Sequence, residues 1–259
     1  MDRKQQKELF DGVVKAVTAC GEMLKDRKAA AEIDSKGRTD FVTAVDLAVQ
    51  ERLKAELARG EIGFLAEEGD GQYAGRDGIL WILDPVDGTT NLIHSFRHSA
   101  ISLALYENGK PLAGIIYGPF AGELFTATAG GGAFLNGEAI SVSGAESLSE
   151  SLCSVGTNPG VRQGADDAFR RLRAVYERCH DIRRIGAASI EMCYVACGRL
   201  EGYAEHGLKP WDYAAGRLIV EEAGGRVTEF DGKPPSIDGA SCDILASNGL
   251  VHDELLSLM

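Results

Sequence analysis

The sequence predicts an α/β protein whose N-terminal half is α+β and whose C-terminal half is α/β. Three observations support this fold class. Apolar residues recur at helical spacing near the N-terminus, short apolar runs alternate with turn residues between Ala100 and Val142, and strand-like and helix-like segments alternate after Ser151. The chain of 259 residues is long enough for one large core or two packed subdomains.

Two helices are expected at the start of the chain. Apolar residues from Leu9 to Leu24 recur at helical spacing, which predicts a long amphipathic helix. The stretch 41–46 is expected to enter a second helix that runs to about Arg59, with its leucines facing inward. These leucines are Leu47, Leu53 and Leu57.

The strands of the first half follow. Residues 62–65 form a short apolar run that ends just before Glu67, and residues 79–83 form a second run that predicts a buried strand ending at Asp84. A β-meander is expected from Ala100 to Val142, because Asn108-Gly109 and other glycine-containing turns separate its apolar runs.

The second half alternates between strands and helices. Strands are expected at 152–155, 182–185, 200–204, 226–229 and 244–246, and helices at 166–178, 189–197, 213–223 and from about residue 250. The small and polar tract Ser143–Ser151 separates the two halves. We therefore predict an N-terminal subdomain of residues 1–146 and a C-terminal subdomain of residues 147–259.

Charge and composition exclude some functions. The formal net charge of −12 argues against binding to a nucleic-acid backbone, although it allows a small anionic substrate beside local cations. No apolar run approaches the roughly 20 residues that span a bilayer. The charged N-terminus has no secretory apolar core, so we expect a cytoplasmic protein without membrane partners. The six cysteines lack C-x-x-C spacing, which argues against a zinc site.

The segment Asp84-Pro85-Val86-Asp87-Gly88-Thr89-Thr90 carries the strongest functional signal. Its two aspartates follow a buried strand, three residues apart, and such close carboxylates repel each other unless a cation lies between them. Mg²⁺ prefers carboxylate and carbonyl oxygens, so the carbonyl of Val86 is a further candidate ligand. Gly88 and Thr89 then begin a helix, whose free N–H groups attract phosphate. A common solvated turn remains the alternative for an isolated D-x-x-D pair.

Two strings resemble the signatures of the inositol monophosphatase family of Mg²⁺-dependent, lithium-sensitive sugar and polyol phosphatases. The first is the stretch 81–91, Trp-Ile-Leu-Asp-Pro-Val-Asp-Gly-Thr-Thr-Asn, and the second is the stretch 211–216 with Glu-Ala-Gly-Gly at 222–225. The resemblance implies a layered αβαβα sandwich of the inositol monophosphatase and fructose bisphosphatase type. It also implies a homodimer and two or three Mg²⁺ ions that activate a water molecule for in-line attack on phosphate.

The resemblance further implies roles for individual residues. The implied metal ligands are Glu67, Asp84, Val86, Asp87 and Asp212. The implied catalytic residues are Glu67, Thr89 and Asp46, where Asp46 accepts the proton of the Thr89 hydroxyl. The implied substrate-binding residues are Gly88, Thr89, Gly186, Ala187, Ala188, Glu205 and Asp212. Without the resemblance, Glu67 is a solvated charge, Asp212 is the N-cap of a helix beginning at Tyr213, and Asp46 is a helix surface residue.

The expected activity is therefore hydrolysis of inositol monophosphate or a related sugar or polyol phosphate. Fructose-1,6-bisphosphatase, histidinol phosphatase and 3′-phosphoadenosine-5′-phosphate phosphatase remain alternatives, although Thr90-Asn91 argues against the last. A non-catalytic polyol-phosphate-binding or interaction protein is the alternative from another class, and it is disfavoured because all four acidic ligands are present. The roles of Arg183, Arg184 and Lys209 stay open between contacts to a more anionic substrate and a solvated basic surface.

Overall fold

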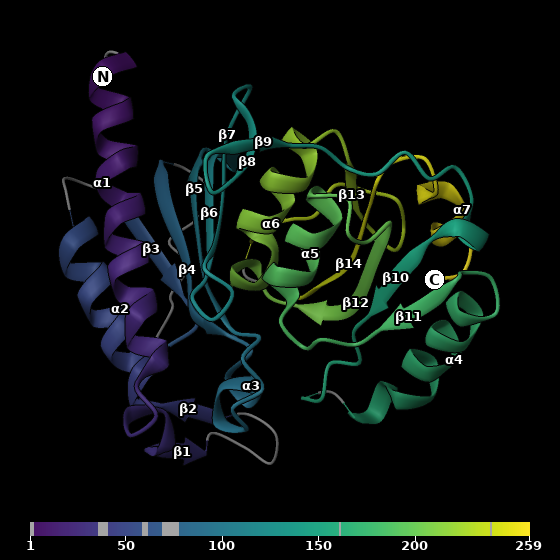
Figure 1. Cartoon of the computed structure of the whole chain (residues 1–259), viewed down its shortest axis with the longest axis horizontal. Coiled ribbons are helices and arrows are strands. Elements are labelled where there is room, and N and C mark those ends of the chain that lie inside the picture. The colour runs from purple at the N-terminus through teal and green to yellow at the C-terminus, as the bar shows by residue number, and fades with distance from the viewer. Residues whose placement is uncertain (1–2, 36–40, 59–61, 69–77, 161, 239) are drawn as a thin grey trace.

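The computed structural model describes residues 3–35, 41–58, 62–68, 78–160, 162–238 and 240–259, which form five stacked layers (Figure 1). Two helices, a seven-stranded sheet, two more helices, a five-stranded sheet and a final pair of helices follow one another across the molecule. The order helix, sheet, helix, sheet, helix confirms the αβαβα sandwich expected from the sequence. In the described part of the chain, no helix is long and apolar enough to cross a bilayer.

The elements have the following bounds. The helices are α1 (Arg3–Gly21), α2 (Ala44–Leu57), α3 (Thr89–Ile93), α4 (Ala165–Tyr176), α5 (Ala188–Ala196), α6 (Pro210–Glu222) and α7 (His252–Leu256). The 3₁₀ helices are η1 (Glu22–Lys25), η2 (Ala29–Ala31), η3 (Leu148–Glu150) and η4 (Arg162–Gly164). The strands of the larger sheet are β3 (Gly63–Ala66), β4 (Ile79–Asp87), β5 (Ala100–Glu107), β6 (Lys110–Gly118), β7 (Glu123–Thr128), β8 (Gly132–Leu135) and β9 (Glu138–Ile140). The strands of the smaller sheet are β10 (Leu152–Val155), β11 (Asp181–Arg183), β12 (Gly202–Leu208), β13 (Arg226–Glu229) and β14 (Cys242–Ser247), and β1 (Ile33–Ser35) with β2 (Phe41–Thr43) forms a separate ribbon.

Helices α1 and α2 cover the outer face of the larger sheet (Figure 1). Val13 and Val17 of α1 and Leu53 and Leu57 of α2 are buried against it, as their helical spacing predicted. The prediction for Leu47 was wrong, because this side chain is 50% exposed.

The error at Leu47 comes from its spacing, because six residues separate it from Leu53 and place it about 240° around the helix from that buried side chain. Residues 41–43 form strand β2 and not the first helical turn, so the helix begins at Ala44. Its buried stripe then includes Val45, Val49 and Leu53 at steps of four residues, and Leu47 lies off this stripe. The expected C-terminal limit, Arg59, lies outside the described residues.

The larger sheet has the order β3-β4-β5-β6-β7-β8-β9. Strands β3 and β4 are parallel, and every later neighbour pair is antiparallel. The predicted hairpin between β5 and β6 is confirmed: Asn108 and Gly109 have φ values of 50° and 76°, as a two-residue turn with two left-handed residues requires. Asn136 and Gly137 connect β8 to β9 in the same way, with φ values of 52° and 85°.

An irregularity in β4 decides where its two aspartates point. In a regular strand, side chains three residues apart lie on opposite faces. Asp84 pairs with Ser102 of β5 and Asp87 pairs with Ala100, so β4 contains one more residue than β5 over this stretch. This bulge brings both carboxylates to the face toward α5 and α6, while Val86 packs on the α1–α2 side. The strand therefore ends at Asp87 and not, as predicted, at Asp84.

The smaller sheet has the order β11-β10-β12-β14-β13. Strands β11, β10 and β12 are parallel, and β14 and β13 continue the sheet in antiparallel fashion. The predicted alternation of strands and helices in this half is confirmed. Helices α4 and α7 cover the outer face of this sheet, and α5 and α6 cover the inner face (Figure 1).

Helices α5 and α6 form a central layer that packs against both sheets. Strand β6 and helix α6 approach so closely that a Cβ at Gly114 would lie 2.8 Å from the carbonyl oxygen of Ala215. Strand β9 ends at Ile140 and β10 begins at Leu152, so the change from one sheet to the other falls within this stretch. Because the two sheets share a helical layer, the division into residues 1–146 and 147–259 stays a prediction.

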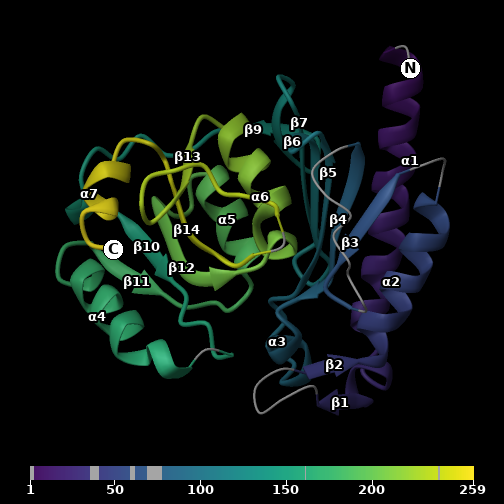
Figure 2. The same ribbon diagram turned by 180° about the vertical axis from the view of Figure 1, so that it is seen from behind.

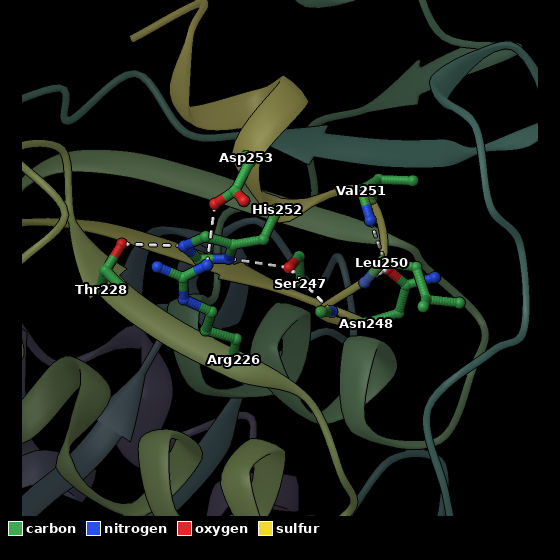
Figure 3. Close-up of polar contacts among 9 residues, drawn as sticks. Arg226, Thr228, Ser247, Asn248, Leu250, Val251, His252 and Asp253 are labelled. Atoms are coloured by element: carbon green, nitrogen blue, oxygen red, sulfur yellow. Dashed lines mark hydrogen bonds and ion pairs between the residues drawn. The ribbon is translucent and has the colours of Figure 1, made fainter.

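A buried histidine ties α7 to the smaller sheet (Figure 3). Nδ1 of His252 lies 2.8 Å from Oγ of Ser247 on β14, and Nε2 lies 3.0 Å from Oγ1 of Thr228 on β13. An ion pair between Arg226 and Asp253, at 2.8 Å, lies beside it. Burial, assisted by the charge of Arg226, lowers the pKa of His252 to about 4. The imidazole is therefore neutral at pH 7.

Candidate active site

The acidic residues singled out in the sequence meet where the ends of β3 and β4 face the first turns of α5 and α6 (Figure 1). Glu67 follows β3, and Asp84 and Asp87 lie at the end of β4. Because β3 and β4 are parallel, their C-terminal ends lie at the same edge of the sheet. Seen from behind, α3 lies below the end of β4 and beside β2 (Figure 2).

Asp84 is almost completely buried, and its Oδ1 accepts a hydrogen bond from the Val86 N–H at 2.9 Å. Burial raises the pKa of Asp84 well above its usual range, and the negative charges of Glu67, Asp87 and Asp212 raise it further. A hydrogen bond between the carboxyl groups of Glu67 and Asp84 acts in the same direction. Two carboxyl groups this close require a shared proton or a cation between them.

Asp87 joins β4 to the start of α5. Its Oδ1 accepts the Ala188 N–H at 3.1 Å, and its Oδ2 accepts the Ser189 N–H at 2.8 Å together with a short bond from the Ser189 hydroxyl. Burial raises the pKa of Asp87 to about 6, although the bonds from Ser189 oppose the shift. The negative charge of Glu205 adds to the increase. Asp87 therefore caps a helix that belongs to the other half of the chain.

Asp212 lies inside α6 and not at its N-cap. The helix begins at Pro210, so the prediction that it begins at Tyr213 with Asp212 as the cap was wrong. The Oδ2 of Asp212 accepts the N–H of the N-cap residue Lys209 at 2.7 Å. Burial raises the pKa of Asp212 well above its usual range, and the charges of Glu67 and other acidic residues of the site add to the shift. Asp212 thus faces the same acidic group as Asp84.

Asp46 and Thr89 are in direct contact. The Oδ1 of Asp46 lies 3.1 Å from the hydroxyl of Thr89, and Oδ2 accepts both the N–H and the hydroxyl of Thr43, at 2.8 and 2.5 Å. Asp46 is fully buried, so its interpretation as a surface residue was wrong. Burial raises its pKa, and the bonds from Thr43 and Thr89 oppose the shift.

The hydroxyl of Thr89 has a second acceptor, the carbonyl oxygen of Val86, at 2.9 Å. A hydroxyl has one hydrogen, so at any moment it donates either to this carbonyl or to Asp46. A carbonyl oxygen has two lone pairs, and the bond from Thr89 leaves one of them for another partner. The Val86 carbonyl can therefore orient Thr89 and still contribute to a metal site.

Gly88 makes the sharp turn from β4 into α3. Its φ of 83° is left-handed, and a Cβ at this position would lie 2.8 Å from the carbonyl oxygen of His98. Its own carbonyl accepts the Leu92 N–H at 3.0 Å and the Ser99 hydroxyl at 2.9 Å. Helix α3 begins at Thr89, as predicted. The first N–H groups of a helix have no carbonyl partner within it, which makes this turn suitable for a phosphate.

The segment 186–188 leads into α5 and lies opposite α3. Gly186 has a left-handed φ of 84°, and Ala187 and Ala188 are buried. The side-chain amide of Asn91, on α3, donates to the carbonyls of Ile185 at 3.0 Å and Gly186 at 3.2 Å. These bonds place the segment beside the turn at Gly88 and Thr89.

Glu191 accepts hydrogen bonds from the backbone of this segment, and it was not among the site residues predicted from the sequence. Its carboxylate accepts the N–H groups of Ile185 at 3.2 Å, Gly186 at 3.1 Å and Ala187 at 3.2 Å, and it takes a short bond from the Ser154 hydroxyl. Burial raises the pKa of Glu191 to about 7, although the Ser154 bond opposes the shift. Five successive N–H groups, 185–189, are therefore donated to two carboxylates, those of Glu191 and Asp87.

A signal for Glu191 exists in the sequence. The helix Ala188–Ala196 reads Ala-Ser-Ile-Glu-Met-Cys-Tyr-Val-Ala, so a single acidic residue stands in an otherwise apolar stretch. A helix that is apolar all round is buried, and a lone carboxylate within it needs hydrogen-bond donors. The sequence alone does not reveal which donors these are.

Glu205 on β12 has a rigidly held carboxylate. Its Oε1 accepts the Asn158 N–H at 2.8 Å, and its Oε2 accepts the Tyr203 hydroxyl at 2.7 Å. The charge of Glu205 raises the pKa of both Asp87 and Asp212, so this residue lies near the acidic group. It is buried and faces the site from the second half of the chain.

The three basic residues whose roles the sequence did not decide lie in different surroundings. Arg183 forms an ion pair with Asp181 at 2.6 Å, outside the site. Nη2 of Arg184 lies 3.3 Å from the Thr157 hydroxyl, and its guanidinium is next to Gly186. Lys209 provides its backbone N–H to Asp212. Arg184 is therefore the basic side chain beside the segment 186–188.

The acidic group fits a hard divalent cation. Among the described residues, no three His, Cys, Asp or Glu side chains are arranged so that they could hold a metal ion, and Asp84, Asp87 and Asp212 each accept a backbone N–H. The donors nevertheless consist of oxygen alone: four carboxylates that act on one another electrostatically and the Val86 carbonyl. Such a set suits Mg²⁺ and not Zn²⁺, which favours nitrogen and sulfur ligands.

Comparison with known proteins shows to which family the chain is similar. Residues 5–259 match the sequence profile of the inositol monophosphatase family. A Xylella fastidiosa protein named Nus factor SuhB is 38% identical over 252 residues, which cover 94% of this chain and 91% of that protein. An inositol-1-monophosphatase of Mesorhizobium japonicum is 39% identical over 229 residues, which cover 87% and 85%.

Solved structures show the same fold. The extragenic suppressor protein suhB of Bartonella henselae superposes with a TM-score of 0.89 at 34% identity, covering 97% of this chain and 98% of that one. The inositol monophosphatase of Thermotoga maritima superposes with a TM-score of 0.86, also at 34% identity, covering 97% and 96%.

Proposed function

This chain belongs to the inositol monophosphatase family, and from that premise we propose that it is a Mg²⁺-dependent phosphomonoesterase for inositol monophosphate or a related sugar or polyol phosphate. Family membership, which the sequence resemblance predicted, makes the chain a phosphoric monoester hydrolase. The observation that carries the proposal is the acidic group of the buried Asp84 and Asp87 with the half-buried Glu67 and Asp212, whose charges need a cation between them.

We assign two or three Mg²⁺ ions to these four carboxylates and to the carbonyl of Val86. When bound, Mg²⁺ would lower the pKa of the attacking water and offset the charge of the phosphate oxygens. The protein contributes the position of each ligand. The bulge in β4 turns Asp84 and Asp87 to one face, and Asp212 approaches from the first turn of α6.

Asp46 and Thr89 form the proton route in this proposal. As the Thr89 hydroxyl takes up a proton from the attacking water, its own proton passes to Asp46, 3.1 Å away. The burial of Asp46 raises its pKa, which favours its acceptance of that proton. Glu67, at the end of β3, accepts a hydrogen bond from the same water and orients it.

The remaining residues bind the substrate. The N–H groups of Gly88 and Thr89 hold the phosphate oxygens. Gly186, Ala187 and Ala188 line the polyol ring, and Glu205 accepts hydrogen bonds from its hydroxyl groups. Asp212 contacts the oxygen that carries the phosphate.

Phosphate release from a panel of substrates in the presence of Mg²⁺ tests the proposal. The panel contains inositol-1-phosphate, fructose-1,6-bisphosphate, histidinol phosphate and 3′-phosphoadenosine-5′-phosphate. We expect the highest kcat/KM with inositol-1-phosphate, and inhibition by lithium. If no phosphomonoester in the panel is hydrolysed, the proposed activity is wrong.

The same panel ranks the alternative substrates. Arg184 is the basic side chain beside Gly186, so a second phosphate group would find its partner there. If fructose-1,6-bisphosphate is hydrolysed faster than inositol-1-phosphate, and Arg184→Gln removes this difference, fructose-1,6-bisphosphatase activity would be supported. If Arg184→Gln lowers kcat/KM equally for both substrates, Arg184 does not distinguish between them.

A second function is suggested by the names of the relatives. Several proteins 38–39% identical to this chain are named Nus factor SuhB. An interaction protein that binds a polyol phosphate without turnover is therefore the second candidate. Binding of inositol-1-phosphate without phosphate release would favour it over the enzyme.

We further propose a cytoplasmic homodimer that acts on a small phosphorylated substrate, without membrane or nucleic-acid partners. The net charge of −12 supports the absence of a nucleic-acid partner. Light scattering coupled to gel filtration measures the oligomeric state directly. A mass of one chain at micromolar concentration would contradict the dimer.

A further inference from the structure

A cavity of about 560 Å³ is lined by residues outside the acidic site. Its walls come from residues 24–31 between α1 and β1, from the end of α3 with the residues that follow it, and from the turn between β6 and β7. None of the residues assigned above to metal, catalysis or substrate lines it. Its volume is in the range of small-molecule sites in proteins.

The described residues that line this cavity have two chemical characters. Leu24 and Leu92, both buried, provide apolar walls with Phe120. Lys25, Arg27 and Arg97 provide positive charge, and no acidic side chain is among the described lining residues. This is an unusual concentration of cations for a chain with a net charge of −12.

The two guanidinium groups are not neutralised within the described part of the chain. Lys25 forms an ion pair with Glu22 at 2.8 Å, whereas Arg27 and Arg97 have no ion pair with any residue that the structure describes. Both arginines are exposed toward solvent. A guanidinium presents several N–H donors in one plane and matches the oxygens of a phosphate, sulfonate or carboxylate.

The wall that carries Arg97 is held in a fixed conformation. Ser95 and Arg97 have φ values of 56° and 55°, a left-handed backbone that residues other than glycine keep only where their surroundings hold it. Asn91 provides that support: its carbonyl accepts the Phe96 N–H at 2.8 Å, and its side-chain amide donates to the His98 carbonyl at 2.8 Å. The cavity is therefore formed before any ligand enters it.

We propose that this cavity binds a small organic anion. The apolar or flat body of the ligand lies against Leu24, Leu92 and Phe120, and its phosphate, sulfonate or carboxylate group lies between Arg27 and Arg97. Binding here does not depend on the phosphatase activity.

The probe for this site is 8-anilinonaphthalene-1-sulfonate, which joins an aromatic body to a sulfonate that a phosphatase does not hydrolyse. Its fluorescence increases when it enters an apolar site, so a titration of the full chain gives a dissociation constant. We expect saturable binding of one molecule per chain. The double variant Arg27→Gln/Arg97→Gln should bind the probe roughly tenfold more weakly or worse, because a charge-assisted hydrogen bond contributes about that factor.

Two control variants show whether the probe binds in this cavity. Arg170→Gln/Arg173→Gln removes the same charge from the exposed surface of α4 and should leave the affinity unchanged. Asp87→Asn alters the acidic site and should also leave it unchanged. Absence of saturable binding, equal affinity in the Arg27/Arg97 variant, equal weakening in the α4 control, or loss of binding in Asp87→Asn would each overturn the proposal. Melting curves confirm that every variant is folded.

Discussion

The carboxylate of Asp87 lies 2.8 Å from the backbone nitrogen of Ser189, although 102 positions separate the two residues in the chain. The contact joins the end of β4 to the first turn of α5 and so connects the two halves of the molecule at the acidic site. Asp87 therefore has two tasks in our proposal: it caps a helix and it binds metal. Substitutions can separate these tasks.

Asp87→Asn should abolish phosphate release and leave the fold intact. The amide keeps the size of the carboxylate but has no charge, so it is a poor Mg²⁺ ligand. Its NH₂ group also replaces one of the two oxygens that accept N–H bonds from α5, which should lower the free energy of unfolding by about 1–3 kcal/mol. Phosphate release and urea unfolding measure the two effects.

Asp231→Asn is the matched control, since Asp231 is exposed and, among the residues that the structure describes, pairs with Lys233 alone. This variant should keep full activity. If Asp87→Asn also keeps its turnover, Asp87 is not a metal ligand.

Thr89→Val should reduce kcat by a factor of about 10² to 10⁴, the usual contribution of a positioned proton-transfer group. Valine has the shape of threonine but no hydroxyl, so it removes the contacts of that hydroxyl with Asp46 and with the Val86 carbonyl. Thr89→Ser keeps a hydroxyl and should retain most of the activity. Steady-state phosphate release compares the three proteins, and a valine variant as active as the serine variant would refute the proposed proton route.

Chelation of divalent cations should stop catalysis, and addition of Mg²⁺ should restore it. The same addition should raise the melting temperature, because an ion among Glu67, Asp84, Asp87 and Asp212 offsets the repulsion that, together with burial, raises the pKa values of Asp84 and Asp212 in the ion-free protein. At a Mg²⁺ concentration 100 times the dissociation constant, the stabilisation is about 2.7 kcal/mol. An Asp84→Asn/Asp212→Asn variant should lose this stabilisation, and full activity in excess chelator would contradict the metal requirement.

Glu191→Gln should raise KM roughly tenfold and change kcat less, since the loss of one charged hydrogen-bond acceptor changes an equilibrium by about that factor. Its carboxylate accepts the N–H groups of Gly186 and Ala187, which we assign to the substrate ring, and of Ile185 just before them, so its loss should disturb binding more than chemistry.

Glu201→Gln is the control for this effect. Glu201 is also a buried carboxylate, and it accepts the Leu152 N–H at 2.6 Å away from the segment 186–188. It should lower stability and leave KM unchanged. Equal KM values in the Glu191 variant and the wild type would show that this residue supports the fold alone.

His252 should make the protein less stable in mild acid. Its pKa is about 4 in the folded chain and 6.5 by its ordinary value, so between these values the unfolded chain takes up a proton that the folded chain does not. The contribution is complete above pH 6.5 and decreases as the pH falls toward 4. Between pH 7.5 and 5, the loss is about 2 kcal/mol.

Urea unfolding at these two pH values measures the loss. His252→Gln removes the titrating group and keeps a side chain that can bond to Ser247 and Thr228. The decrease in unfolding free energy between pH 7.5 and 5 should be smaller in this variant. An equal decrease in both proteins would show that other groups control the acid sensitivity.

Local patterns in the sequence were sufficient to predict much of the fold. The hairpin at Asn108-Gly109 and the strand before Glu67 were predicted correctly, because each depends on residues next to one another in the chain. The entry into α2 differed from the expectation because pairing between β1 and β2 draws residues 41–43 into a strand, and Leu47 was placed on the wrong face because six residues separate it from Leu53.

The site was harder to predict where it depends on distant contacts. No local pattern shows that Asp46 is fully buried beside Thr89, 43 positions away, or that Glu191 bonds to Ser154, 37 positions away. The bulge in β4 depends on pairing with β5, so the common direction of Asp84 and Asp87 was also beyond the reach of sequence periodicity.

The extra residue in β4 makes the motif sensitive to length as well as to composition. Deletion of Val86 would let β4 pair regularly with β5, and both aspartates would still share a face, since they would then be two positions apart. What the deletion would remove is backbone: at Val86, the N–H bonds to Asp84 and the carbonyl accepts the Thr89 hydroxyl. Such a protein would keep every acidic residue and lose the main-chain groups between them, so the number of residues in this turn is itself a requirement for function.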